Sequence, residues 1–183
     1  MWNESFTSAP QLKRDPLDGA YGTLQPPMSF DQALALADPE DTVDALADVL
    51  WQRVDSDWSA LSSAERVVFG VWSLKVEVFN GGFAQFFFNA VGEATPQIVD
   101  ALQQVGSPKA AEIVETAHRL ALGGVSLSDW RARQARIDGL SSVEREQLQD
   151  LSDQLEDVLK DIMAGTRAFA VAHREEFHDD PVE

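Results

Sequence analysis

The residues best suited to bind a small ligand surround a pair of glycines in the middle of the chain. Glu77, Gln85 and Asn89 place one carboxylate and two amides on either side of the sequence Asn-Gly-Gly-Phe at 80–83. Such groups could line a polar pocket in an enzyme or a small-ligand protein. They could also satisfy backbone groups where two helices meet, because helix ends leave N–H and C=O groups without partners. We favour this structural role, and the pocket remains the alternative.

The residue types that carry most enzyme chemistry are scarce or unsuitably spaced. The chain has no cysteine, which excludes thiol catalysis and cysteine metal sites. Its histidines are His118, His173 and His178, and the spacing of the last two is not that of paired ligands on a helix. The sequence contains no phosphate-binding glycine loop, no G-x-S-x-G and no H-E-x-x-H. We therefore expect no enzyme activity, no metal and no cofactor.

The glycine pair is expected to lie between two helices. Asn and Gly tolerate the left-handed conformation that ends a helix. After them, Phe83, Phe86, Phe87 and Ala90 fall on one helical face, which predicts burial of that face. The stretch 77–89 is therefore predicted to be a helix end, a two-glycine turn and the start of an aromatic helix ending near Gly92.

Helix-start signals recur along the rest of the chain. Capping boxes begin at Ser29, Ser62 and Ser141, each followed three residues later by Gln or Glu. Further starts are expected at Thr95-Pro96, at Ser107-Pro108, and at Ser126 or Ser128, the last opening a basic helix with Arg131, Arg133 and Arg136. The helix after Ser141 is expected to be long, with Gly165 as its point of interruption.

No alternating run is long enough to indicate a strand, so the predicted fold is all-α. We expect a single-domain helical bundle of about seven to nine helices over residues 29–177. An extended Pro- and Gly-containing N-terminal arm, 1–28, is expected before it, and an acidic tail, 178–183, after it.

Net charge narrows the classes of partner. The 183 residues carry 31 acids against 14 bases, a net charge of −17. Direct nucleic-acid binding is disfavoured, because phosphate neutralisation needs Lys and Arg. No apolar run reaches the length of a membrane span and no signal peptide is recognisable, so we expect a soluble, cytoplasmic protein that does not bind membranes. The acidity favours a basic partner, a cation, high solubility or adaptation to salt.

Most of the acidity lies in regions 29–61 and 141–161, on either side of the neutral stretch 62–92. In each region the carboxylates recur on one helical face, opposite the apolar one. Each row would be roughly 20 Å long, with a carboxylate about every 5 Å, enough to imitate a local patch of phosphates. Ordinary solvated faces are the alternative. The first acidic row is Asp41, Asp44, Asp48 and Asp55, and the second acidic row is Glu146, Asp150, Asp153, Asp157 and Asp161.

Around the glycine pair the sequence resembles a bacterial family catalogued as domain of unknown function 4375. The resemblance covers roughly residues 44–172 and rests on a motif that we interpret as structural. That family is similar to a DNA-mimic protein, an acidic α-helical molecule that occupies the DNA-binding surface of a helix-turn-helix regulator. The resemblance implies the fold, but no shared motif carries the acidic residues. The motif residues are Glu77, Asn80, Gly81, Gly82, Phe83, Gln85, Phe87 and Asn89.

The leading hypothesis is a non-enzymatic acidic protein that places its two rows against a basic, DNA-binding regulator. An immunity-type inhibitor of a toxic nuclease is a second hypothesis, because a nuclease cleft is also basic. A small-ligand or enzyme role at Glu77, Gln85 and Asn89 is a third. Salt adaptation without a specific partner and assembly as a homodimer also stay open.

Overall fold

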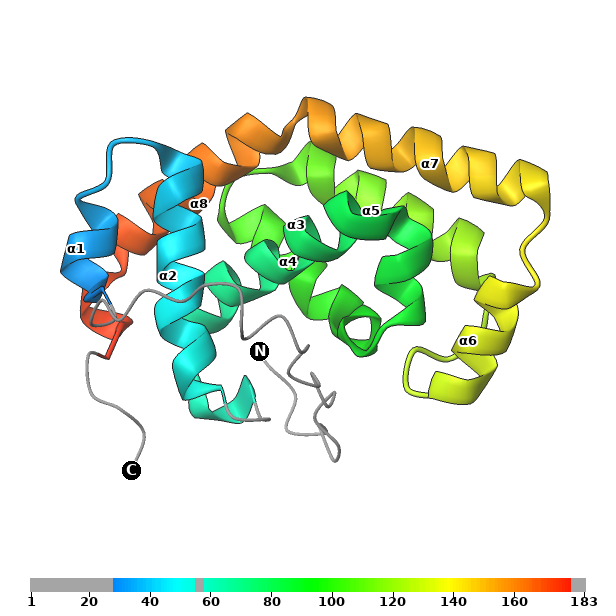
Figure 1. Cartoon of the computed structure of the whole chain (residues 1–183), viewed down its shortest axis with the longest axis horizontal. Coiled ribbons are helices and arrows are strands. Elements are labelled where there is room, and N and C mark those ends of the chain that lie inside the picture. The colour runs from blue at the N-terminus through cyan, green and yellow to red at the C-terminus, as the bar shows by residue number, and fades with distance from the viewer. Residues whose placement is uncertain (1–27, 55–57, 179–183) are drawn as a thin grey trace, which may run out of the picture.

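The computed structural model describes residues 28–54 and 58–178, which form α-helices joined by short turns (Figure 1). No strand occurs in this part of the chain, so the all-α prediction is confirmed. Asp55, nearly all of the expected arm 1–28 and nearly all of the tail 178–183 lie outside the described residues. The helices are α1 Phe30–Leu34, α2 Pro39–Arg53, α3 Ser63–Phe88, α4 Thr95–Gln104, α5 Pro108–Leu122, α6 Trp130–Asp138, α7 Ser142–Asp157 and α8 Leu159–Ala172, with 3-10 turns at Trp58–Ala60, Ala90–Ala94 and Arg174–Glu176.

All three capping boxes are present. At α3, the Ser62 hydroxyl accepts the Glu65 N–H at 3.1 Å, and the Glu65 carboxylate accepts the Ser62 N–H at 2.8 Å. The same reciprocal pair opens α1 at Ser29 and α7 at Ser141. These starts follow from a few adjacent residues, which is why the sequence alone predicts them.

Two other helix starts differ from the prediction. Thr95 lies inside the first turn of α4 and donates its hydroxyl to the Gly92 carbonyl at 2.6 Å, because the preceding 3-10 turn leads directly into the helix. Helix α6 is capped by Asp129, whose carboxylate accepts the Ala132 N–H at 3.0 Å, and not by Ser126 or Ser128. Ser107 and Pro108 open α5 as expected.

The expected long C-terminal helix is two helices, and the predicted point of interruption is wrong. The break is at Val158, where φ is −105° and ψ is 4°. Gly165 lies inside α8, where a Cβ atom would clash with the Val105 carbonyl after α4. The glycine therefore permits close packing between chain segments, a role that its position in the sequence does not reveal.

Helix α3 lies at the centre and packs against α2, α4, α5, α6, α7 and α8. The larger cluster of buried apolar side chains joins α3 to α8 and includes Val43 of α2, and a smaller one joins α1, α2, the start of α3 and the end of α8. Trp58, Trp72 and Phe169 pack against both. Figure 1 shows α7 and α8 following each other along one side, with α1 and α2 at one end and α6 at the other.

The helical backbone of α3 is interrupted at the glycine pair. Gly81 has φ −157° and ψ 24°, and Gly82 has φ 69° and ψ −177°. The conformation of Gly82 is essentially confined to glycine, because other residues place a Cβ atom against the backbone there. The predicted two-glycine turn is therefore confirmed as a kink within α3.

The aromatic segment after the kink is shorter than predicted. Phe83, Phe86 and Phe87 are fully buried, as their spacing indicated. The helix ends at Phe88 instead of near Gly92. A Cβ atom at Gly92 would lie 2.7 Å from the Phe86 carbonyl oxygen, so the chain turns tightly back onto the helix end.

We expect Gly82→Ala to destabilise the protein by about 1–3 kcal/mol, because alanine would have to adopt a conformation reserved for glycine. Its Cβ atom would also lie 3.2 Å from the Ser152 hydroxyl. Urea unfolding monitored by circular dichroism measures the change. The matched control is Gly70→Ala in the same helix, where the nearest atom would be 3.6 Å from the new Cβ and helix propensity favours alanine. Equal stability of the two variants would contradict the assignment.

Candidate functional site

The kink brings together side chains that a straight helix would separate. Glu77 and Asn89 are twelve residues apart, which is about 18 Å along an uninterrupted helix. Here the Glu77 Oε2 atom accepts a hydrogen bond from Asn89 Nδ2 at 2.8 Å and one from Gln85 Nε2 at 2.9 Å. The two halves of α3 are therefore joined through one carboxylate oxygen.

A buried contact ties the kink to α7. The Phe83 N–H, the first after the glycine pair, donates to the Ser152 hydroxyl at 3.1 Å. Ser152 in turn donates to the Leu148 carbonyl at 2.9 Å. Because helix N-terminal N–H groups lack partners within the helix, Ser152 acts as a cap supplied from another helix. The position of α7 on α3 is thus fixed at the kink.

Arg133 of α6 closes the other end of the aromatic segment. Its side chain is 1% exposed, and its Nη1 atom donates to the Asn89 carbonyl at 2.8 Å. Burial lowers the pKa of Arg133, yet a guanidinium of such high ordinary pKa stays charged. The sequence placed this residue in a basic helix and did not reveal that it is buried.

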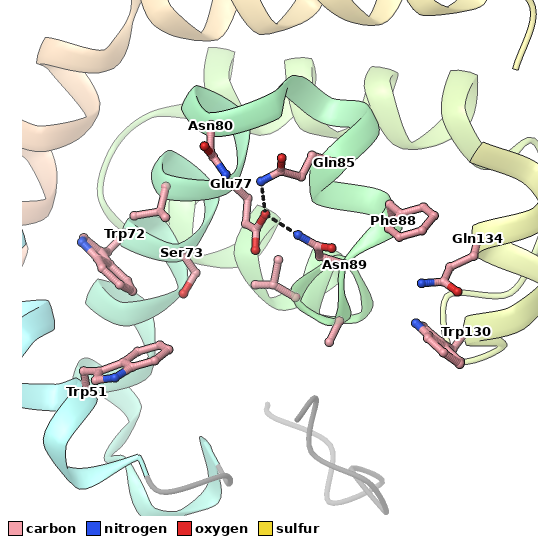
Figure 2. A pocket seen from close by; sticks show the side chains of 13 residues that line it. Trp51, Trp72, Ser73, Glu77, Asn80, Gln85, Phe88, Asn89, Trp130 and Gln134 are labelled. Carbon is pink, nitrogen blue, oxygen red and sulfur yellow. Dashed lines mark hydrogen bonds between the residues drawn. The ribbon is translucent and has the colours of Figure 1, made fainter. Parts of the chain in front are cut away.

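A pocket of about 550 Å³ opens beside these contacts (Figure 2). Its polar wall is formed by Glu77, Asn80, Gln85 and Asn89. These residues therefore have both of the roles considered from the sequence. The amides of Gln85 and Asn89 hold two helical segments together, and the same side chains line a pocket. None of the described residues that line it is a lysine or an arginine.

Tryptophans from three helices form the remaining walls. Trp51 of α2 and Trp72 of α3 meet edge to face, with ring centroids 5.9 Å apart. Trp130, at the start of α6, stands at the opposite side in Figure 2 and is 51% exposed. Sequence reasoning missed all three, because residues so distant in the chain give no shared pattern. The only signal was the unusual number of tryptophans, five in the chain.

The first acidic row lies on α2 and is partly neutralised. Asp44 and Glu40 each bind the Lys75 Nζ atom of α3 at 2.8 Å. Although burial alone would lower the pKa of Lys75, its hydrogen bonds to these carboxylates raise it above the usual value. Burial, and then repulsion from Asp44, raise the pKa of Asp48. Asp41 is exposed, and the fourth member of the row is not among the described residues.

The second acidic row is fully exposed. Its first four members lie on α7, and Asp161 lies beyond the break, on α8. Within residues 28–54 and 58–178, no ion pair joins any of the five carboxylates to a cation. Only Asp153 has a side-chain partner there, accepting a hydrogen bond from Gln149 Nε2 at 2.8 Å. This row therefore presents its charge outward.

Two arginines near the start of α7 are engaged in contacts between α6 and α7. Arg145 donates to the Ile137 and Asp138 carbonyls, at 2.9 and 3.1 Å. Arg136 binds Glu144 at 2.6 Å. These arginines tie α6 to α7, and neither forms an ion pair with the second acidic row.

The two acidic rows do not lie side by side on parallel helices. Helix α2 packs chiefly on α8, whereas α7 packs chiefly on α3 and α5. Figure 1 shows α2 running across the direction of α7, near one end of the molecule. A partner that lies along α7 would therefore meet the second row first.

The histidines offer no catalytic arrangement in the described chain. His118 packs against the Phe87 ring, with ring centroids 5.9 Å apart, and burial followed by Arg119 lowers its pKa. His173 binds Glu176 at 2.8 Å on the surface. In the same part of the chain, no three His, Asp or Glu side chains are grouped to hold a metal. Nor is any helix there long and apolar enough to cross a membrane.

Residues 59–173 match the family described as DMP19-like protein. The chain belongs to this family. The label of domain of unknown function 4375 remains a prediction. The sequence predicts a family resemblance over roughly residues 44–172, and the DMP19-like match covers residues 59–173. Neither the curated proteins nor the solved structures yield a match.

The DMP19-like region separates the two acidic rows. The whole first row precedes residue 59, whereas the whole second row lies within the matched residues. The kink, Glu77 and two of the three pocket tryptophans are also inside the region, and Trp51 is outside it. The family thus includes α7 and its connection to α3, but not α2.

The start of α7 adds a fixed negative charge. Side-chain and backbone hydrogen bonds from Ser141, together with Arg136, lower the pKa of Glu144 from 4.5 to about 2. Because the folded pKa is depressed, the stability from this carboxylate is present above about pH 4.5 and is lost as the pH falls towards 2.

We expect Glu144→Gln to melt at a lower temperature than the parent at pH 7, because the ionised hydrogen bonds are lost. The difference should shrink as the pH falls from about 4.5 towards 2, where the parent carboxylate is itself protonated. Thermal melts across this range provide the measurement, with the exposed Glu146→Gln, two residues further along α7, as the control. A difference that stays constant with pH would argue against this assignment.

Proposed function

We propose that this DMP19-like protein is a non-enzymatic DNA mimic that occupies the basic DNA-binding surface of a transcription regulator. The observation that carries the proposal is the second acidic row on α7 and α8, which is exposed and, within the described residues, forms no ion pair. Its position inside the matched family region supports the same choice. The first row is secondary, because Lys75 already neutralises part of it.

The spacing of the carboxylates suits this role. On α7, Glu146, Asp150, Asp153 and Asp157 follow one another at intervals of three or four residues, which is about 5 Å along the axis. A single DNA strand carries a phosphate every 3.4 Å or so. Lysine and arginine side chains are long enough to adjust to this difference, so a surface that binds phosphates could bind this helix face.

Charge would act on the approach as well as in the complex. A net charge of −17 attracts a basic surface over the Debye length, about 8–10 Å at physiological salt. Exposed ion pairs are screened by salt, so the interaction should weaken as ionic strength increases.

The test is displacement of fluorescent operator DNA from purified helix-turn-helix regulators of the source organism, measured by anisotropy. The parent protein should release DNA from at least one regulator at low salt. The fourfold variant E146Q/D150N/D153N/D157N should need about 30-fold more protein, because four exposed ion pairs of about 0.5 kcal/mol each sum to about 2 kcal/mol.

The matched control is D100N/E112Q/E115Q/E175Q. These four carboxylates are also exposed and lie outside α7, on α4, on α5 and in the 3-10 turn Arg174–Glu176, so the net charge changes equally. An equal loss in both variants would show a general charge effect and would contradict an α7 interface. Inhibition of a basic nuclease, without displacement of any regulator, would favour the immunity alternative.

A further inference from the structure

The tryptophan-lined pocket beside the kink has no part in the proposed contact along α7. Its one charged lining residue is Glu77, and none of its described lining residues compensates that charge. A half-buried carboxylate with no cation among the described lining residues favours a positively charged group from outside. The same charge disfavours phosphate and carboxylate ligands.

The carboxylate of Glu77 is held ready for such a group. Both amide hydrogen bonds, from Gln85 and from Asn89, go to Oε2. Among the described residues, Oε1 receives no hydrogen bond, and Figure 2 shows it on the side of Glu77 that faces the tryptophans. Because two donors fix the carboxylate plane, little freedom is lost when Oε1 binds a donor.

The amide of Asn89 supplies a second acceptor. Its NH₂ group must face Glu77, because a carboxylate accepts hydrogen bonds and does not donate them. Its carbonyl oxygen is thereby turned away from Glu77. A planar guanidinium, with five N–H donors, can reach several acceptors at once, whereas an ammonium offers three donors from one point.

The aromatic walls favour the same ligand. Tryptophan is the best aromatic partner for a cation, and guanidinium groups also stack on its face. Figure 2 shows Trp51 and Trp72 on one side of Glu77 and Trp130 on the other. Trp130 is 51% exposed, so a ligand in the pocket would cover apolar surface that now faces solvent.

We propose that this pocket binds a guanidinium group, supplied by an arginine side chain of the basic partner. The identity of the carrier rests on the proposed function, whereas the guanidinium site itself does not. Glu77 and Asn89 accept its N–H groups, and the tryptophans cover its faces.

The site is tested first with N-acetyl-arginine amide, titrated into the full chain and followed by tryptophan fluorescence and calorimetry. A ligand of this size should bind with Kd of about 1 mM. The neutral isostere N-acetyl-citrulline amide and a neutral disaccharide should bind at least about tenfold more weakly. Binding of either as tightly as the arginine derivative would overturn the guanidinium assignment.

Two variants test whether the ligand binds in this pocket. Glu77→Gln should weaken binding of the arginine derivative about tenfold, and Trp130→Ala about threefold or more. The controls are Glu146→Gln, an exposed acid on α7, and Val143→Ala, an exposed apolar residue, and both should bind as the parent does. Because Trp130 is exposed, its replacement leaves the fold intact. Unchanged binding in both pocket variants would overturn the site.

A second arm tests the carrier. The E146Q/D150N/D153N/D157N variant should bind N-acetyl-arginine amide as the parent does, even where it fails to displace DNA. In the displacement assay, Glu77→Gln and Trp130→Ala should each require several-fold more protein than the parent and than Glu175→Gln, an exposed acid outside α7. Normal displacement by both variants, together with their loss of arginine-amide binding, would show a free guanidinium ligand and overturn the partner arginine as the source.

Discussion

The hydrogen bonds around the Gly81–Gly82 kink are the constraint on which both candidate surfaces depend. The kink turns α3 back on itself, so that Glu77 meets Gln85 and Asn89 across a distance that a straight helix would not allow. It also exposes the Phe83 N–H, which Ser152 of α7 satisfies. The kink therefore brings together the residues of the polar wall of the pocket and fixes the helix that carries most of the second acidic row. Its role is architectural, but the architecture sets where charge and aromatic rings are presented.

Several of the bases among the described residues are used inside the fold. Arg133 satisfies the end of α3, Arg145 satisfies the end of α6, and Lys75 joins α2 to α3. Each binds groups that would otherwise be partly buried without a partner. Among the described residues, none of these bases forms an ion pair with the second acidic row. The two acidic rows have similar spacing in the sequence, but Lys75 partly neutralises the first row, and the second row forms no ion pair among the described residues. The net charge of the chain does not reveal this difference.

The features that the sequence could predict are those that depend on residues close to one another in the chain. The capping boxes at Ser29, Ser62 and Ser141 and the glycine turn depend on residues within four positions of one another, so fold class and most helix starts followed from them. Gly165 was misread because its reason is the Val105 carbonyl, sixty residues away in the chain. The pocket escaped prediction for the same reason: Trp51, Trp72 and Trp130 come from three helices. The periodicity of the acidic residues predicted which helix faces carry them. It gave no information about Lys75, which reaches the first row from another helix.

A DNA mimic competes for arginines that DNA already binds well, and equal charge density is hard to achieve on a helix. One helix face offers a carboxylate about every 5 Å, less than the density of a single phosphate strand. A pocket that combines a carboxylate with tryptophan rings adds what a sugar–phosphate backbone lacks, namely cation–π contact with the guanidinium. Such a contact resists salt better than an exposed ion pair, because screening acts mainly on solvated charges. Long-range attraction by α7 would then speed the encounter with the regulator, and short-range binding at Glu77 would lengthen the residence time of the complex.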